Sequence, residues 1–360
     1  MQVQSLFELS ATISPLTPDL EARTMSLPAA VFSADVLKID AAAISADIQA
    51  KIRDIVLERL NRKGVVIAIS GGIDSSVVAA LCVKALGTAR VLGLMLPDAD
   101  SSPDSLQFAS LLAQSIGLRT HIENIAGILT AAGCYQRRDE AIRRVIPEYA
   151  AGYKCKIVLP DRVNGGAYPI FSVVVESPLL ERTKARLTLE SYLGVVAATN
   201  FKQRTRKMME YYYADLFNYA VVGTPNRAEY DQGFFVKNGD GAADLKPIAH
   251  LYKTQVYQLA AYLDIPREIQ KRPPTTDTYP LDQSQEEFYF PLPYDRMDLC
   301  LYAKNHGLLP EEIASAIELT TEQAARVYRV IDATRNATRY LHNRPVLCEE
   351  VREVADDARV

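Results

Sequence analysis

The sequence predicts an α/β fold in which a parallel β-sheet is flanked by helices, with a β-hairpin insertion and C-terminal helices. Two observations support this prediction. Short apolar runs rich in β-branched residues alternate with helix-length amphipathic segments, which is the order of strands and crossover helices in a parallel sheet. One of these runs, 65–69, is followed at once by a glycine-rich turn and a helix, and ligands bind at this end of parallel strands.

A regular order of helices and strands is expected from residue 44 onward. Ile44, Ile48, Ile52 and Leu60 recur at helical spacing and predict a helix over 44–61. Apolar, β-rich runs predict strands over 65–69, 91–97, 118–125 and 220–224. Amphipathic segments before these strands predict helices over 75–86, 102–116 and 204–217.

The segment 151–176 departs from this alternation. Its residues alternate in polarity and Asn164-Gly165-Gly166 is a strong turn signal, so we expect a β-hairpin inserted within about 135–190. From Met297 onward, EEIASAI and EQAARVYRVIDATRNATRYL predict two or three short helices. The expected organisation is an irregular extension over 1–37, a core over 38–296, a helical segment over 297–346 and a tail over 347–360.

Composition and charge limit the classes of function. The 360 residues carry a formal net charge of -4, and a general nucleic-acid binder needs a basic face, so nucleic acid is not an expected partner. The five cysteines are widely spaced and form no CxxC pair, which indicates neither a disulfide framework nor a zinc site. Residues 1–37 resemble neither a secretory signal nor a membrane span. We therefore expect a cytoplasmic protein without a membrane partner.

The stretch 69–77, ISGGIDSSV, has the composition of a phosphate-binding loop. Two glycines let the backbone approach an anion, and the helix-opening N–H groups and the hydroxyls of Ser70, Ser75 and Ser76 can donate to phosphate oxygens. The loop contains no lysine, so it is not the Walker pattern GxxxxGK[ST], and it is not GxGxxG. The alternative is a strand-to-helix turn of small residues with a serine or aspartate cap.

Residues 70–75, SGGIDS, resemble the motif of the ATP pyrophosphatases, which cleave ATP to AMP and pyrophosphate. Later blocks resemble the NAD synthetase family in the family's order along the chain. They are NFKQRTR (200–206), VVGTPNRAE (221–229), GFFVKNGDGAADLKPI (233–248) followed by LYKTQVYQLA, and KRPPTTDTYPLDQSQEE (271–287). The resemblance covers about 40–344 and implies an adenine nucleotide α-hydrolase-like fold.

This resemblance implies an ammonia-dependent ligase. The nicotinate carboxylate of deamido-NAD attacks the α-phosphorus of ATP to give a mixed anhydride and pyrophosphate, and ammonia then displaces AMP to give NAD. Because an anion must approach a polyanion, cations and Mg2+ are expected around the site. Only about 40 residues precede the matching region, so no glutaminase domain fits, and free ammonia or ammonia from a separate glutaminase is the expected donor. The family also implies a homodimer.

Site residues are carried over from matching positions only. The resemblance places Asp74 and Glu229 on Mg2+ and gives Asp74 and Lys237 catalytic roles. The residues implied for ATP and pyrophosphate are Ser70, Gly71, Gly72, Asp74, Ser75, Ser76, Arg204, Thr224 and Thr275. The residues implied for the acceptor are Asn200, Lys237, Asp240 and Asp244. Taken singly, Arg204 and Arg206 could lie on a solvated helix face, and Asp240 could be a turn former.

The sequence departs from the family pattern next to the expected acceptor pocket. Pro225 stands where the family has glycine and Arg227 where it has lysine, and Tyr230 and Asp231 replace smaller or apolar residues. The region before Asn200 is also longer by about a hairpin. These departures leave open a related enzyme that adenylates and amidates a different carboxylate.

Two further alternatives have less support. A catalytically degenerate member would bind nucleotide as a regulatory protein, but Ser70, Asp74, Glu229 and Lys237 are intact. Enzymes that thiolate tRNA share the pyrophosphate loop, but they need reactive cysteines and an RNA-binding surface. Cys82 falls on the apolar face of a predicted helix and the chain is acidic, so this class is disfavoured.

Overall fold

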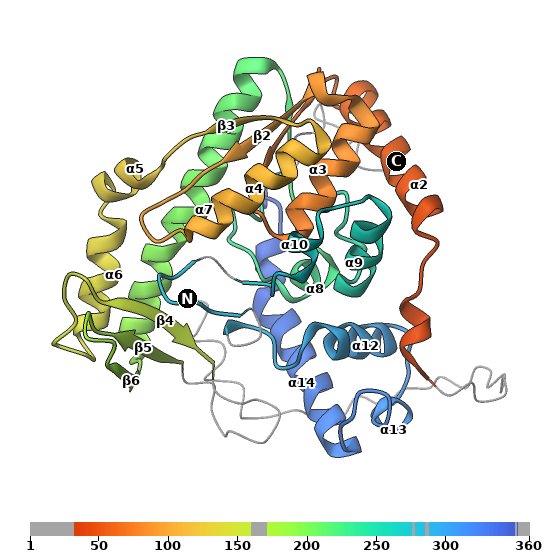
Figure 1. The fold of residues 1–360 in the computed structure, drawn as a ribbon. Helices are drawn as coiled ribbons and strands as arrows, with labels where there is room; N and C mark the ends of the chain where they lie inside the picture. The colour runs from red at the N-terminus through yellow and green to blue at the C-terminus, as the bar shows by residue number, and fades with distance from the viewer. Residues whose placement is uncertain (1–31, 160–170, 276–277, 285–287, 350, 352–360) are drawn as a thin grey trace.

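The structure, a computed structural model, describes residues 32–159, 171–275, 278–284, 288–349 and 351. A four-stranded parallel sheet with the order β3-β2-β1-β7 lies at its centre (Figure 1). The strands are β1 (Val65–Ala68), β2 (Val91–Met95), β3 (Arg119–Ile122) and β7 (Ala220–Val222). The predicted α/β fold class and the four predicted strands are therefore confirmed.

Helices cover both faces of this sheet (Figure 1). Alternate residues of β1 face opposite sides, so Val65 and Ile67 pack in one apolar core and Val66 in another. The first core includes residues of α2 (Ala41–Arg53), α3 (Ile73–Leu86), α4 (Pro103–Ile116), α9 (Lys253–Tyr262) and α10 (Arg267–Lys271). The second includes residues of α5 (Ala126–Ala131), α6 (Cys134–Arg143) and α7 (Leu189–Phe217).

Shorter elements and the C-terminal helices complete the described chain. The shorter elements are η1 (Ala34–Leu37), the π-helix η2 (Asp54–Arg59), η3 (Thr88–Arg90) and α8 (Arg227–Gln232). The C-terminal elements are α12 (Tyr294–Asn305), α13 (Pro310–Ile313), α14 (Thr321–Thr338) and η4 (Arg339–His342). Helices α12 and α14 share a separate apolar core that includes Leu37 and Ala228. The predicted C-terminal helices are present, although the domain boundaries stay predictions.

Helix α7 begins 15 positions before the predicted start at residue 204, and this difference matters for the site. Thr188 caps it by accepting a hydrogen bond from the Ser191 N–H. The N-terminal half packs on the inserted sheet through Val195, whereas the C-terminal half packs on the parallel sheet through Ala214. Because the apolar side of the helix changes along its length, no single periodic face predicted its first half.

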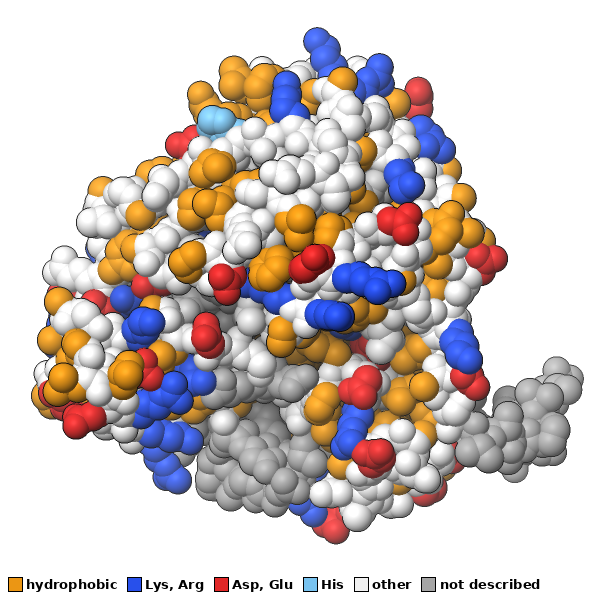
Figure 2. Space-filling view, viewed as in Figure 1, with side chains coloured by type: hydrophobic (Ala, Val, Ile, Leu, Met, Phe, Trp, Pro, Cys, Tyr) orange, Lys and Arg blue, Asp and Glu red, His pale blue; other side chains and the backbone are white. Residues whose placement is uncertain are grey.

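The predicted insertion forms an antiparallel sheet of β4 (Lys154–Val158), β5 (Ser172–Glu176) and β6 (Arg182–Arg186) in that order. The pairing of β4 with β5 confirms the hairpin, and β6 was not predicted. The turn expected at 164–166 lies outside the described residues. One face packs on α6 and α7, and Figure 2 shows basic side chains gathered over this part of the molecule. None of the described helices is long and apolar enough to cross a membrane.

Candidate active site

The loop between β1 and α3 has a shape that requires glycine. Gly71 has a φ of +73°, and a Cβ there would lie 2.7 Å from the Ser105 carbonyl oxygen. The hydroxyls of Ser75 and Ser76 donate to the Gly72 carbonyl at 3.1 and 2.8 Å, and the Ser70 hydroxyl accepts from the Gly72 N–H at 3.3 Å. The loop is thereby shaped into a cradle at the N-terminus of α3, which favours an anion.

A cavity of about 1200 Å³ opens over this loop. Ser70, Gly72 and Ser75 line it, whereas Ser76 is buried beneath the loop. The other walls come from the carboxyl ends of β2 and β7, from α7 and α14, and from the chain around 229–240 and 272–289 where it is described. This volume exceeds the usual range for one small-molecule pocket, so the cavity has room for more than one nucleotide.

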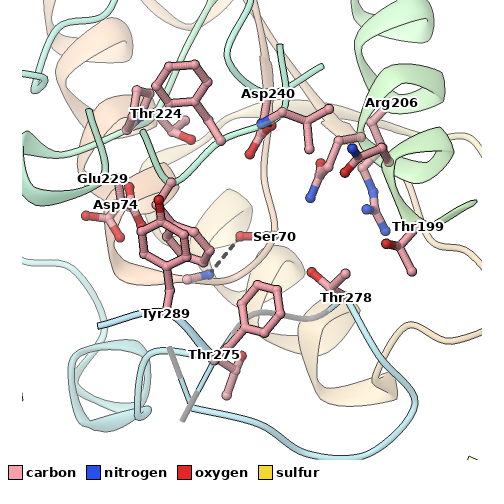
Figure 3. A pocket seen from close by; sticks show the side chains of 18 of the residues that line it. Ser70, Asp74, Thr199, Arg206, Thr224, Glu229, Asp240, Thr275, Thr278 and Tyr289 are labelled. Atoms are coloured by element: carbon pink, nitrogen blue, oxygen red, sulfur yellow. Dashed lines mark hydrogen bonds between the residues drawn. The ribbon is translucent and has the colours of Figure 1, made fainter. Parts of the chain in front are cut away.

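Asp74, on the first turn of α3, is held by two side chains from distant parts of the chain. Its Oδ2 accepts a hydrogen bond from Lys253 Nζ, and its Oδ1 accepts one from Asn226 Nδ2 at 3.2 Å. Asn226 also caps α8 in a reciprocal capping box with Glu229, with hydrogen bonds of 3.1 and 3.2 Å. Figure 3 shows Asp74 and Glu229 side by side in the cavity. The two carboxylates predicted to bind metal are thus brought together.

Lys253 is a site residue that the sequence analysis did not identify. It is only 1% exposed. Burial alone would lower the pKa of its ammonium group, but the carboxylates of Asp74 and Glu229 outweigh this effect and raise the pKa, so the group stays charged. It is the first residue of α9, where the helix dipole disfavours a cation. A lysine at the start of a predicted helix is therefore the sequence signal that could have identified it as a site residue.

The donor set at Asp74 and Glu229 fits Mg2+ only if phosphate oxygens complete it. Among the described residues, no group of three or more His, Cys, Asp or Glu side chains could hold a metal by itself. Mg2+, however, is commonly bound by one or two carboxylates together with substrate phosphates and water. Asp74 is itself part of the cradle of 70–76, so a bound polyphosphate would supply the missing oxygens.

The opposite wall is lined by Arg204, which was predicted to bind ATP, and by three residues predicted to bind the acceptor, Asn200, Lys237 and Asp240. Arg204 donates from Nε to the Lys237 carbonyl at 3.3 Å, which ties α7 to the 233–240 loop. Lys237 Nζ itself donates to the carbonyls of Tyr340 and Asn343 at 2.8 and 3.1 Å. Asn200 and Asp240 also line the cavity, and burial raises the pKa of the Asp240 carboxyl.

Asp244 lies outside this wall. Its Oδ2 accepts from the Val221 N–H at 2.7 Å, and its Oδ1 accepts from the Tyr211 hydroxyl at 3.2 Å. Both oxygens therefore hold β7 and α7 together, and Asp244 is absent from the cavity lining. Its predicted contact with the acceptor stays a prediction.

The remaining predicted residues flank the phosphate cradle. Thr224 follows β7 and Thr275 pairs with Ser284 in an isolated bridge, and both threonines line the cavity. Arg272, which was not singled out, donates from Nη2 to Ser105 Oγ at 2.9 Å and lies over the Phe108 ring. It thus brings a second positive charge next to the cradle.

The motif NFKQRTR contributes a buried ion cluster. Lys202 Nζ lies 2.6 Å from Asp100 and 3.3 Å from Asp98, and it donates to the Thr278 carbonyl at 2.8 Å. Arg206 Nη2 lies 2.6 Å from Asp98, so Arg206 is not on a solvated helix face. These pairs fix α7 against the chain that follows β2 and against the segment after Thr275.

Comparison with known proteins gives a consistent family. The family model described as NAD synthase matches residues 44–146 and 177–340. A protein of Rhizobium rhizogenes named NH(3)-dependent NAD(+) synthetase is 55% identical over 319 residues, which are 89% of this chain and 96% of that protein. A protein of Rhizobium meliloti with the same name is 56% identical over 324 residues, 90% of this chain and 97% of that protein.

Solved structures share the fold at low sequence identity. The NMN synthetase of Francisella tularensis superposes with a TM-score of 0.60 at 22% identity, covering 86% of this chain and 99% of that one. The NH3-dependent NAD synthetase of Campylobacter jejuni, solved with nitrate, gives a TM-score of 0.57 at 23% identity and covers 86% and 100%. The arrangement of sheet and helices is thus one that these enzymes also have.

Proposed function

The chain belongs to the NAD synthase family, and we propose that it uses ATP and ammonia to convert deamido-NAD to NAD, AMP and pyrophosphate. The observation that carries this proposal is the meeting of three parts in one cavity: the cradle of 70–76, the carboxylate pair Asp74 and Glu229, and the loop that carries Lys237 and Asp240. The names of the 55–56% identical relatives support the choice of acceptor and nitrogen donor.

In the first step, a carboxylate oxygen of the acceptor attacks the α-phosphorus of ATP, and the bond from that phosphorus to the oxygen bridging the α- and β-phosphates breaks. Pyrophosphate leaves with the electron pair. The cradle N–H groups, the hydroxyls of Ser70 and Ser75, and the charges of Lys253 and Arg272 stabilise the departing anion. Asp74 and Glu229 would hold Mg2+, which neutralises phosphate charge when bound.

In the second step, ammonia attacks the carbonyl carbon of the mixed anhydride, AMP leaves and one proton is released. Lys237 and Asn200 would orient the acceptor from the wall formed by α7 and the 233–240 loop. Asp240 would hold the 233–240 loop in place on this wall, because its Oδ1 accepts a hydrogen bond from the Val236 N–H at 2.7 Å. Ammonia is free in this proposal or is delivered by a separate glutaminase.

The proposal also includes a homodimer in the cytoplasm. Met208, Tyr212 and Leu216 recur every fourth residue on α7 and are 53%, 55% and 59% exposed. An exposed apolar stripe of this kind on a long helix is typical of a subunit interface. All five cysteines are unpaired thiols, which supports a reducing compartment.

The decisive experiment measures pyrophosphate release with ATP, Mg2+ and ammonium, with and without deamido-NAD, and identifies products by mass. Release that depends on deamido-NAD, with NAD and AMP formed in equal amounts, is the expected result. If only another carboxylate triggers release, that carboxylate is the acceptor in place of deamido-NAD. Nucleotide binding without release under any of these conditions would favour a regulatory protein.

A further inference from the structure

A second cavity, of about 530 Å³, lies at the edge of the parallel sheet where its strands begin. Its lining includes Lys63, two residues before β1, then Arg90, directly before β2, and Arg119, the first residue of β3. Because the strand order is β3-β2-β1, these cations come from three neighbouring strands. At about 4.8 Å between strands, they are spread over about 10 Å. The phosphate cradle follows the other end of β1, so the two cavities lie at opposite edges of the sheet.

Gly64 shapes the edge of the sheet at this cavity. A Cβ there would clash with the Arg90 carbonyl oxygen and would lie 2.8 Å from the Tyr219 ring. Because this position carries no side chain, the Tyr219 ring passes over Gly64, and its hydroxyl donates to the Ala89 carbonyl at 3.2 Å. The ring therefore joins the start of β7 to the residue before Arg90, and it holds an aromatic group beside the cations.

Neutral groups position the basic residues at this cavity. Arg62, which also lines it, donates from Nη1 to Asn218 Oδ1 at 2.6 Å, and the Lys63 N–H donates to the Asn218 carbonyl at 2.9 Å. The Arg119 guanidinium lies 5.2 Å from the centroid of the Phe217 ring. These contacts hold the two arginines in place without cancelling their charge.

The positive charge of this cavity is not balanced by the protein. Among the residues that the structure describes, none of the four basic residues that line the cavity forms an ion pair, and no Asp or Glu lines it. The chain as a whole carries a net charge of -4, so this cluster runs against its overall charge. Like charges gathered in one cavity repel one another, and a bound anion would offset that repulsion.

We propose that this cavity binds a polyphosphate, either free or as part of a nucleotide. Cations spread over about 10 Å match an extended ligand with several anionic groups better than a single phosphate. Arginine suits this ligand, because a guanidinium binds phosphate oxygens through two parallel hydrogen bonds. The rings of Phe217 and Tyr219 add aromatic surface on which the base of a nucleotide can stack. The inference does not depend on the proposed function, because the cavity lies away from the cradle.

The chain contains no tryptophan, so one tryptophan placed at this cavity gives a fluorescence signal from this site alone. Phe217→Trp keeps an aromatic ring beside Arg119, and it is titrated with tripolyphosphate, ATP or orthophosphate at constant ionic strength. Tyr262→Trp, at an exposed position of α9, is the control reporter. We expect a saturable change with tripolyphosphate in Phe217→Trp only. Orthophosphate should bind at least about 10-fold more weakly, because it reaches fewer of the cations.

Two cations are then replaced in the Phe217→Trp reporter. The pair Lys63→Gln and Arg90→Gln leaves in place the guanidinium of Arg119 that lies over the reporter ring. The matched control pair, Arg53→Gln and Lys84→Gln, removes two exposed charges outside the cavity. We expect the first pair to weaken tripolyphosphate binding at least about 10-fold, because charge-assisted hydrogen bonds are lost. The control pair should bind like the reporter itself, and urea unfolding should be unchanged in both.

The comparison of ATP with tripolyphosphate identifies the source of the phosphates. Tighter binding of ATP would mean that a nucleotide is recognised, and equal or weaker binding that the phosphate chain is sufficient. Both results support the site. Three results would overturn it: no saturable response, the same response in both reporters, or equal weakening by both pairs of substitutions. A lower mass of the first pair in light scattering, without any response to anions, would also overturn it, because the cations would then face a second copy of the chain.

Discussion

Lys253 donates a hydrogen bond to Asp74 from 179 positions further along the chain, and this contact joins the phosphate cradle to α9. The lysine is fully buried and lies over the Tyr294 ring, whereas Asp74 is partly exposed to the cavity. An ion pair of this kind is costly to break from one side, because the remaining charge stays desolvated. The stability of the site therefore depends on keeping both charges of this ion pair.

Replacing Lys253 by methionine should abolish pyrophosphate release, with kcat lowered at least about 100-fold, because one cation near the departing pyrophosphate is lost. The same change should lower the free energy of unfolding by about 3–5 kcal/mol, since Asp74 loses its partner. Steady-state kinetics and urea unfolding at pH 7.5 measure the two effects. Lys84→Met, which removes an exposed lysine from α3, should change neither quantity.

The double variant Asp74→Asn, Lys253→Met separates the two roles. It removes both charges, so it should recover most of the unfolding free energy that Lys253→Met loses. Pyrophosphate release should stay absent. Turnover within threefold of the parent in either variant would contradict a role for this pair in catalysis.

The cradle should not tolerate a side chain at Gly71. In Gly71→Ala the new Cβ would sit 2.7 Å from both the Ser105 carbonyl oxygen and Phe108 Cβ, at a positive φ. We expect a loss of about 1–3 kcal/mol in unfolding free energy and a loss of ATP binding. Gly127→Ala is the matched control, because its Cβ would meet open space on α5. ATP binding retained by Gly71→Ala would argue against the cradle as the phosphate site.

The sheet and the cradle could be predicted from the sequence because both depend on local signals. The strands are short, buried and apolar, and ISGGIDSSV contains the glycine and the hydroxyls that form the loop. The four blocks that resemble the family then identified Thr224, Glu229 and Lys237 as site residues. All three line one cavity in the structure. The order of the four blocks along the chain supported the assignment of these residues to a site, even where each residue alone had another explanation.

The sequence could not reveal the contacts made between distant segments. Asp244 lies in a motif that was expected to contact the acceptor. Its oxygens accept hydrogen bonds from the Val221 N–H and the Tyr211 hydroxyl, and these contacts depend on how β7 and α7 pack. The first half of α7 and strand β6 were missed because neither has a consistent apolar face. The pairing of Lys253 with Asp74 likewise depends on how α9 meets α3.

Stability should fall as pH rises through the titration of Asp298. Burial raises the pKa of its carboxyl to about 6 from 3.8, against hydrogen bonding from Thr254. The folded state thus binds more protons than the unfolded state between these values, so unfolding free energy declines by roughly 3 kcal/mol from pH 3.8 to above 6 through this group. Asp298→Asn should remove that part of the slope and stabilise the protein at pH 8.

The measurement compares urea unfolding of Asp298→Asn and the parent protein at several pH values from 4.5 to 8. The difference between the two should grow with pH and level off above about 7, because the carboxyl is then ionised in both states of the parent. Other titrating groups cancel in this difference. A difference independent of pH would show that the Asp298 carboxyl has an ordinary pKa.

The stripe on α7 should control the oligomeric state. Tyr212→Glu places a charge between Met208 and Leu216, and a buried unpaired charge is strongly unfavourable, so the proposed dimer should dissociate. Light scattering after size exclusion should then give a monomer mass near 40 kDa for the variant and twice that for the parent. Tyr262→Glu, at a tyrosine 49% exposed on α9, is the control and should leave the mass unchanged. A parent protein that is already monomeric would reject the interface, whatever the variants do.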